Sequence, residues 1–345
     1  MSYRPTIRGK EASTGREGNS INSARQGLID NKFFKALLLA PGVLTLLYGG
    51  ISFIGARIVA FVPPKAVTKT PAVLGLNYRD VSFPSREDHL LLRGWFIPGV
   101  LPGGQLTTER TIIMVHGVHS NRAAPEAGLL DLSAALARHG FAILAFDMRG
   151  HGQSAPAPLS WGYFEQRDVL GAVDFLRSGS LPYPELGHPH AIGGWGISMG
   201  GATMLLAAAH EPAIRGVVAD CAFAAFVPLI EKDPNIPNMF IPSVADAMSL
   251  LYGINYYAVR PVDVVASIAP RPLFFIQGTA DTLVPSWNMN LLANAASAAP
   301  GAHVQTWLVP GAQHVQSYHV MKAEYVKRVV AFFTTTLGPA THATY

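Results

Sequence analysis

Cysteine is nearly absent from this sequence. Cys221 is the single cysteine among 345 residues. One thiol forms no intrachain disulfide, and it cannot build a zinc site that depends on several cysteines. The cysteine content therefore excludes a small disulfide-stapled fold, and it leaves the redox compartment of the protein open.

Charged side chains are also scarce, at 14% of residues against 49% hydrophobic ones, and the net charge is +4. Residues 1–35 contain seven basic and three acidic side chains, which gives +4, so the rest of the chain sums to zero. A nucleic-acid surface needs Lys and Arg clustered on a folded domain. We therefore expect no nucleic-acid partner.

Several cofactor motifs are missing as well. The chain has no Walker A sequence, no H-E-x-x-H pair and no glycine triple at Rossmann spacing. His188 and His190 form a pair that is typical of a loop rather than of a metal site. We predict neither a cofactor nor a metal.

A long uncharged run is the first feature that is present. It covers residues 36–56, between Lys35 and Arg57. As a helix it would extend about 31 Å, close to the hydrocarbon thickness of a bilayer. We predict a membrane anchor helix over 33–60. Because more Lys and Arg precede the run than follow it, the N-terminus is expected in the cytoplasm and the remaining domain outside it.

Two alternatives to the anchor stay open, a buried core helix and a cleavable signal peptide. The basic segment ahead of the run is longer than an ordinary signal-peptide n-region, and no clean A-x-A site follows it. A third reading is a soluble enzyme in which the segment docks as a lid or a dimer arm. The anchor remains our interpretation.

The other parts of the chain follow from composition. Residues 1–32 are polar and aperiodic, which predicts a disordered basic tail. Residues 61–75 contain three prolines, Pro63, Pro64 and Pro71, and read as an extended linker. Residues 76–338 are expected to fold as one domain. Within it, the proline-rich apolar stretch 222–262 predicts a small inserted cap.

Short β-rich runs alternate with helical stretches in that domain, which predicts an α/β fold with a mostly parallel sheet and helices on both faces. The expected strands are 78–83, 90–97, 111–116, 142–147, 191–197, 216–220, 273–278 and 304–309. The expected helices lie near 124–138, 164–178, 199–210, 286–298 and 317–337. Because no helix separates the first two strands, they should form an antiparallel hairpin. The cap follows the sixth strand.

Ser198 is the candidate nucleophile. It is the central residue of the one G-x-S-x-G sequence, at 196–200, between an expected strand and an expected helix. A serine at such a strand-to-helix apex adopts a strained turn that presents its hydroxyl above the sheet. A glycine-rich packing turn is the alternative.

A serine hydroxyl needs a base within hydrogen-bond reach, usually a histidine that a carboxylate orients. Asp281 and His314 each follow an expected strand at its C-terminal end, and they come in the order acid, then base. The alternatives are a helix N-cap role for Asp281 and a solvated loop for His314. Asp263 and His319 are weaker candidates because neither directly follows a strand.

The oxyanion of an acyl-transfer intermediate needs hydrogen-bond donors. The strand at 111–116 leads into the sequence HGVH, where Gly117 lets a backbone N–H approach a ligand. We assign the backbone amides of Val118 and Met199 to this role, with a plain glycine turn as the alternative.

The set HGVHSN, FDMRGHGQS, GWGISMGG, GTADTLVP and GAQH, in this order and spacing, resembles the α/β-hydrolase superfamily over about 78–335. It is most similar to the bacterial membrane-anchored esterase, monoacylglycerol-lipase-like and serine-peptidase-like branch. The resemblance implies the α/β-hydrolase fold, nucleophile Ser198, acid Asp281, base His314 and oxyanion amides Val118 and Met199. The loop after Asp147 matches a family signature, and we assign no catalytic role to Arg149 or His151.

We therefore predict a serine hydrolase that cleaves carboxylic esters, with a hydrophobic, lipid-like ester as the expected small-molecule partner. An aminopeptidase, amidase or thioesterase with the same triad is the alternative within hydrolases. A catalytically inactive binding protein on the same fold is the alternative from another class. Epoxide hydrolases and dehalogenases of this fold carry Asp where this chain has Ser198, so we do not expect those activities.

Overall fold

The computed structural model describes Met1 and residues 32–339. The chain divides into two units, Met1–Ile54 and Gly55–Tyr345. The predicted disordered tail over residues 1–32 falls almost wholly on residues 2–31, which lie outside the described part of the chain.

Helix α2 (Lys32–Ala60) contains the uncharged run. Its segment Phe34–Ala60 is long and apolar enough to cross a membrane, and 6% of the span's most apolar window is buried. Leu38 and Leu46 are 66% and 77% exposed. A core helix of a soluble protein would bury such side chains. The last turns of α2, from Gly55 onward, belong to the second unit.

The second unit is built on an eight-stranded sheet in the order β1-β2-β6-β5-β7-β8-β9-β10. β1 pairs with β2 and β2 with β6 in antiparallel fashion, and the remaining pairs are parallel. The strands are β1 (Arg79–Pro84), β2 (Leu91–Ile97), β5 (Arg110–Val115), β6 (Ala142–Asp147), β7 (Ala191–Ile197), β8 (Ile214–Asp220), β9 (Leu273–Gly278) and β10 (Val304–Val309). The predicted fold class and the opening antiparallel hairpin are thus confirmed. A short second sheet, β3 (Gly99–Val100) with β4 (Leu106–Thr107), was not predicted.

The helices follow the predicted alternation. The helix expected over 317–337 is broken at Met321, whose φ of −132° is not helical. The helices are α3 (Leu129–Arg138), α4 (Gln166–Arg177), α5 (Met199–His210), α9 (Trp287–Ser297), α10 (Ser317–Val320) and α11 (Lys322–Leu337). Residues 222–262, the expected cap, contain α6 (Phe226–Ile230) and α7 (Ile241–Tyr252), and α8 (Pro261–Val264) follows.

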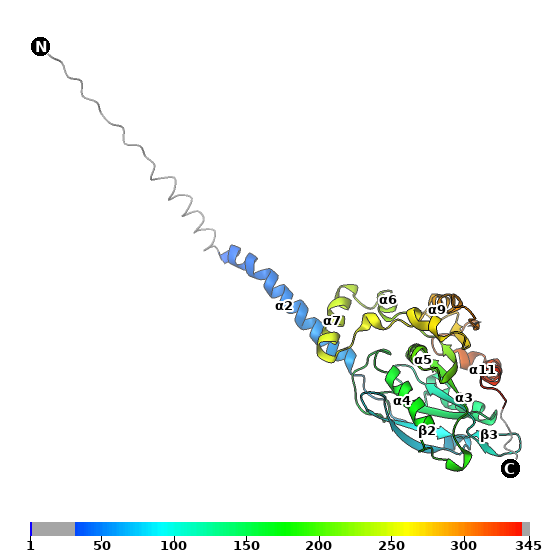
Figure 1. The fold of residues 1–345 in the computed structure, drawn as a ribbon. Coiled ribbons are helices and arrows are strands. Elements are labelled where there is room, and N and C mark those ends of the chain that lie inside the picture. The colour runs from blue at the N-terminus through cyan, green and yellow to red at the C-terminus, as the bar shows by residue number, and fades with distance from the viewer. Residues whose placement is uncertain (2–31, 340–345) are drawn as a thin grey trace. The chain divides into compact units, whose positions relative to one another are not determined.

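The hydrophobic core lies on both faces of the sheet. Along β5, Ile113 and Val115 join the cluster that includes side chains of α4, α5 and α9, whereas Ile112 and Met114 join the cluster under α3 and α11. Figure 1 shows these helices around the sheet. Because both faces are buried, the central strands are continuously apolar rather than alternating.

The strand order reverses at β5, which defines a crevice at the carboxyl ends of the strands. From β5 the chain continues to β6 on one side and then returns to β7 on the other. A crevice forms outside the carboxyl ends of the strands at such a reversal. Gly117 follows β5 and Ser198 follows β7, so both lie at this reversal.

Candidate active site

Ser198 occupies a tight turn between β7 and α5. Its φ of 54° and ψ of −123° are unfavourable for a residue with a side chain. The turn persists because its neighbours fix it. The Ser198 N–H donates to the Asp220 carbonyl at 2.8 Å, and an added Cβ on Gly196 would overlap the Gly200 carbonyl oxygen. Glycine is thus required beside the serine, and the strain holds the hydroxyl at the sheet edge.

The structure brings the three side chains of the candidate triad together. The Ser198 Oγ lies 2.9 Å from the His314 Nε2, and the His314 Nδ1 lies 2.8 Å from the Asp281 Oδ2. An ionised carboxylate only accepts hydrogen bonds, so Nδ1 carries the hydrogen and Nε2 is left to accept the serine proton. The Asp281 side chain is fully buried, whereas that of His314 is 18% exposed.

The Asp281 carboxylate is fixed by four hydrogen bonds. Oδ1 accepts from the backbone amides of Leu283 and Val284 at 3.0 and 2.8 Å. Oδ2 accepts from His314 and from the Gln277 Nε2, the latter at 2.9 Å. Gln277 is buried on β9 and also donates to the Val284 carbonyl. Sequence reasoning missed this residue, although a polar side chain inside the run LFFIQG is a signal that could have found it.

The histidine loop carries strain of its own. Val315, directly after His314, has a φ of 57°. That region is costly for a β-branched residue. Because this backbone strain lies next to the imidazole, we interpret it as part of what positions His314.

The two amides assigned to the oxyanion come from different segments, Val118 after β5 and Met199 directly after Ser198. Met199 is the first residue of α5, so its N–H is one of the four that the helix leaves unpaired. The Val118 N–H has no acceptor within the described residues. A Cβ added to Gly117 would lie 3.3 Å from the Ser198 Cβ. The loop therefore passes close to the nucleophile, and a side chain at Gly117 would crowd it.

His116 holds this loop in place. Its Nδ1 lies 2.7 Å from the Gly117 carbonyl, and its Nε2 accepts from the Met148 N–H at 3.1 Å. The second bond leaves Nε2 without a hydrogen, so Nδ1 donates to Gly117. Burial, with His151 nearby, lowers the pKa of His116 to about 3. A neutral His116 thus links the candidate oxyanion loop to the loop after β6.

Asp220 is a buried acid beneath the candidate triad that sequence reasoning also missed. It ends β8, and its carboxylate accepts from the Tyr325 hydroxyl at 2.9 Å and from the Ser317 hydroxyl at 3.3 Å. Burial raises the pKa of Asp220 to about 7 despite these bonds. Tyr325 in turn accepts from the Trp195 Nε1 at 3.1 Å. This chain joins β7, β8 and α11 below Ser198.

The other acids and bases considered from the sequence lie elsewhere in the hydrogen-bond network. The Asp263 carboxylate pairs with Arg260 at 2.5 Å, and the His319 ring packs on Tyr318. Arg149 is buried between Asp168 and Asp88, at 2.6 Å from each carboxylate. That arrangement gives Arg149 a structural role.

Cys221, Asp281 and His314 place three potential metal-ligand atoms within 4.8 Å of one another. This set does not fit a metal ion. Burial raises the pKa of the Cys221 thiol well above its usual value, and a metal binds the thiolate. Asp281 and His314 are already hydrogen bonded to each other.

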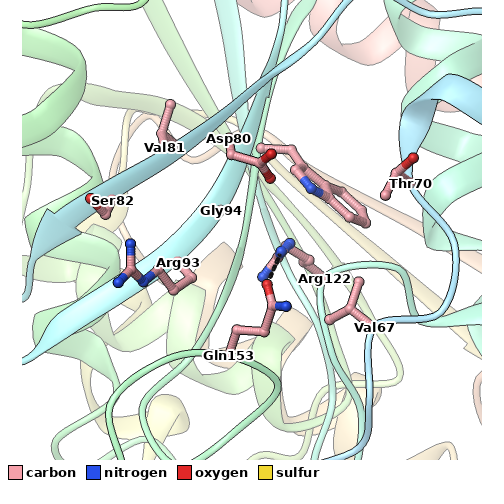
Figure 2. A pocket seen from close by; sticks show the side chains of 10 residues that line it. Val67, Thr70, Asp80, Val81, Ser82, Arg93, Gly94, Arg122 and Gln153 are labelled. Atoms are coloured by element: carbon pink, nitrogen blue, oxygen red, sulfur yellow. Dashed lines mark hydrogen bonds between the residues drawn. The ribbon is translucent and has the colours of Figure 1, made fainter.

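A polar hollow lies beside β1 and β2 (Figure 2). It has a volume of about 650 Å³ and is lined by polar residues that include Asp80 and Gln153. Figure 2 shows Arg122 bonded to Gln153, and Arg122 also forms an ion pair with the buried Asp147 at 2.5 Å. Since none of Ser198, Asp281 and His314 lines this hollow, we do not assign the chemistry to it.

Comparison with known proteins agrees with this architecture. A family model described as the alpha/beta hydrolase fold matches residues 110–240. The uncharacterized protein YfhR of Escherichia coli (strain K12) is 28% identical over 257 residues, which cover 73% of this chain and 80% of YfhR. The uncharacterized protein YqkD of Bacillus subtilis (strain 168) is 27% identical over 313 residues, which cover 86% of this chain and 97% of YqkD.

A solved structure adds a functional neighbour. The Pyrococcus furiosus esterase Pf2001 aligns with a TM-score of 0.64 and 28% identity, over 80% of this chain and 100% of that one. The strand order, the family model and this neighbour agree with one another. The chain therefore has the α/β-hydrolase fold.

Proposed function

We propose that this protein is a serine hydrolase that cleaves carboxylic esters through an acyl-enzyme intermediate. The observation that carries the proposal is the continuous hydrogen-bond chain from Ser198 through His314 to Asp281. His314 Nε2 takes the Ser198 proton as Oγ attacks the ester carbonyl, and the imidazolium then protonates the departing alcohol. Water cleaves the acyl-enzyme by the reverse steps.

The backbone amides of Val118 and Met199 would donate to the oxyanion of each tetrahedral intermediate. Donors of this kind contribute on the order of 10² to 10³ in rate each. The buried Asp281 keeps the His314 hydrogen on Nδ1 and stabilises the imidazolium without taking its proton. The roles thus follow from which atoms can donate and which can accept.

An ester is favoured over an amide by the likeness to the esterase Pf2001. A panel of p-nitrophenyl esters, aminoacyl-nitroanilides and acyl thioesters separates the three classes. Ester turnover is expected, and turnover of only the anilides or only the thioesters would replace the esterase assignment.

Fluorophosphonate labelling tests the nucleophile. The full-length protein should be labelled, Ser198→Ala should not, and Ser286→Ala serves as the matched control because its side chain forms no capping hydrogen bond at α9. A folded wild-type protein that resists labelling would favour a binding protein on this fold.

We also propose that α2 anchors the protein in a membrane, with the N-terminus in the cytoplasm and the domain outside it. The exposed apolar side chains of α2 support this. Carbonate washing should leave the protein in the membrane fraction, whereas release would indicate a soluble enzyme. The mass of the mature protein distinguishes an anchor from a cleaved signal peptide, and protease protection reports the orientation.

A further inference from the structure

An apolar cavity of about 250 Å³ lies in the second unit. Its wall contains no charged side chain, and its members include Gly55, Val59, Trp161, Phe226, Val244 and Tyr256. The Tyr256 hydroxyl is occupied, because it donates to the Leu159 carbonyl at 3.3 Å. A cavity of this kind offers water too few partners and favours an apolar occupant.

Three segments far apart in the sequence build the wall. The last turns of α2 contribute Gly55 and Val59, the loop after β6 contributes Trp161, and the cap contributes the rest. The Leu159 N–H donates to the Ala60 carbonyl at 2.7 Å, which ties the loop to the end of α2. The cap helix α7 lies close as well, since a Cβ on Gly55 would be 3.3 Å from the Val244 Cγ2.

Trp161 is held in a costly conformation to reach this wall. Its φ is 58°, in the left-handed region that bulky residues avoid. The buried Glu165 fixes the turn by accepting from the Ser160 N–H at 2.8 Å and from the Gly162 N–H at 2.7 Å. The Trp161 ring stacks on Phe226 with 4.5 Å between centroids. The buried Glu165 carboxylate thus holds Trp161 in its place in the wall of the apolar cavity.

The cavity wall shares a hydrophobic cluster with residues of the candidate active site. Phe226 and Tyr256 belong to the same buried hydrophobic cluster as Met199, and Val118 packs against that cluster. Phe226 also follows Cys221 by five residues, and the Cys221 ligand atom lies within 4.8 Å of those of Asp281 and His314. The cavity wall and the side chains of both candidate oxyanion residues therefore adjoin the same hydrophobic cluster.

Exposed apolar side chains surround the end of α2. Phe61, directly after the helix, is 45% exposed and meets the Tyr252 ring edge-on at 5.7 Å between centroids. On α7, the neighbouring Leu250 and Leu251 are 76% and 44% exposed. This surface begins where the candidate membrane span stops. A lipid surface is the environment in which it would be covered.

We infer that the cavity binds the acyl chain of a lipid ester, which enters from the bilayer beside the last turns of α2. The inference rests on the proposed function, because the ester carbonyl must reach Ser198. The anchor helix then serves as a wall of the substrate site in addition to holding the protein at the membrane. Its residues Gly55 and Val59 set how much chain the cavity accepts.

The test measures kcat/KM for p-nitrophenyl esters from acetate to laurate, with the full-length chain in lipid nanodiscs. Each methylene that enters should raise kcat/KM about fourfold until the cavity is filled. Val59→Phe should lower kcat/KM for octanoate and longer esters by roughly tenfold to a hundredfold and leave acetate unchanged. Val244→Ala should move the optimum to longer chains.

Ile58→Phe is the matched control. Ile58 directly precedes Val59 on the same helix, is 70% exposed and does not line the cavity. It should leave the profile unchanged. An unchanged profile in both Val59→Phe and Val244→Ala would overturn the inference. Equal losses on all esters, acetate included, would overturn it too.

A binding readout keeps this inference separate from the proposed function. In Ser198→Ala, bromo-octanoic acid should quench the fluorescence of Trp161, and the quenching should disappear when Trp161→Phe is added. Fluorophosphonate labelling with a flat chain-length profile and no quenching would refute the cavity while the serine hydrolase stands. Quenching without labelling or turnover would refute the hydrolase alone.

Discussion

Replacing Gln277 with leucine tests how far the acid of the candidate triad depends on its support. Gln277 is fully buried, and its Nε2 donates to the Asp281 Oδ2 and to the Val284 carbonyl, both at 2.9 Å. Its Oε1 has no partner among the described residues. Leucine has a similar volume, so Gln277→Leu removes two hydrogen bonds without opening a large cavity.

Two quantities should change by different amounts. A hydrogen bond to a charged group contributes about 1.5 to 3 kcal/mol, so a less firmly held Asp281 should lower kcat about tenfold to a hundredfold. The Val284 carbonyl loses its donor, which costs roughly 1 to 3 kcal/mol of unfolding free energy. In a protein of this size that corresponds to a fall in Tm of about 2 to 4 °C per kcal/mol.

The assay pairs ester turnover in nanodiscs with thermal unfolding of the same samples. Gln277→Glu is the informative companion, because only the protonated glutamic acid can donate to Asp281. Its activity should therefore fall as the pH rises, beyond any fall in the wild type. A lower Tm with unchanged kcat in Gln277→Leu would refute the positioning role and leave Gln277 a packing residue.

Three further outcomes follow from buried groups. Burial raises the Asp220 pKa to about 7, so the folded state keeps a proton that the unfolded chain releases at about pH 4. The unfolding free energy should therefore fall by about 1.4 kcal/mol per pH unit as the pH rises between those two values. Asp220→Asn should flatten this slope in denaturant titrations, and an unaltered slope would contradict the assignment. Arg149→Met leaves Asp168 buried without its partner and should cost about 3 to 5 kcal/mol of stability with kcat of the folded enzyme preserved, whereas a selective loss of kcat would make Arg149 functional. Gly117→Ala places a methyl 3.8 Å from the Ser198 Oγ and should lower kcat on the order of a hundredfold at unchanged Tm. Full activity would show that the substrate carbonyl does not bind beside Gly117.

The sheet was predictable because each of its long strands has a recognisable local sequence pattern. Strands such as Ala142–Asp147 are short, apolar on both faces and bounded by turn residues, and their ends match the expected ones. The pair β3 and β4 was missed because two-residue strands carry no periodicity. The break at Met321 was missed because residues 317–337 look helical throughout.

The residues of the candidate site likewise separate into those with a local sequence signal and those without one. Ser198, Asp281 and His314 could be named because each follows a strand in a fixed chain order. Gln277 lies only four residues before Asp281 and carried a local signal, whereas Asp220 acts through a partner that the fold alone brings near. Asp220 meets Tyr325 across 105 residues. No local pattern encodes such a contact.

Helix α2 has features that its composition alone does not predict. Over residues 36–56 the prediction rests on the absence of charge, which treats every face of the helix alike. In the last turns, Ala56 and Ala60 are fully buried, four residues apart, while Ile58 between them is 70% exposed. Small residues at this spacing let a neighbouring segment approach closely. The end of α2 is therefore a docking face, and the helix that composition marks as an anchor is also a wall of the cavity.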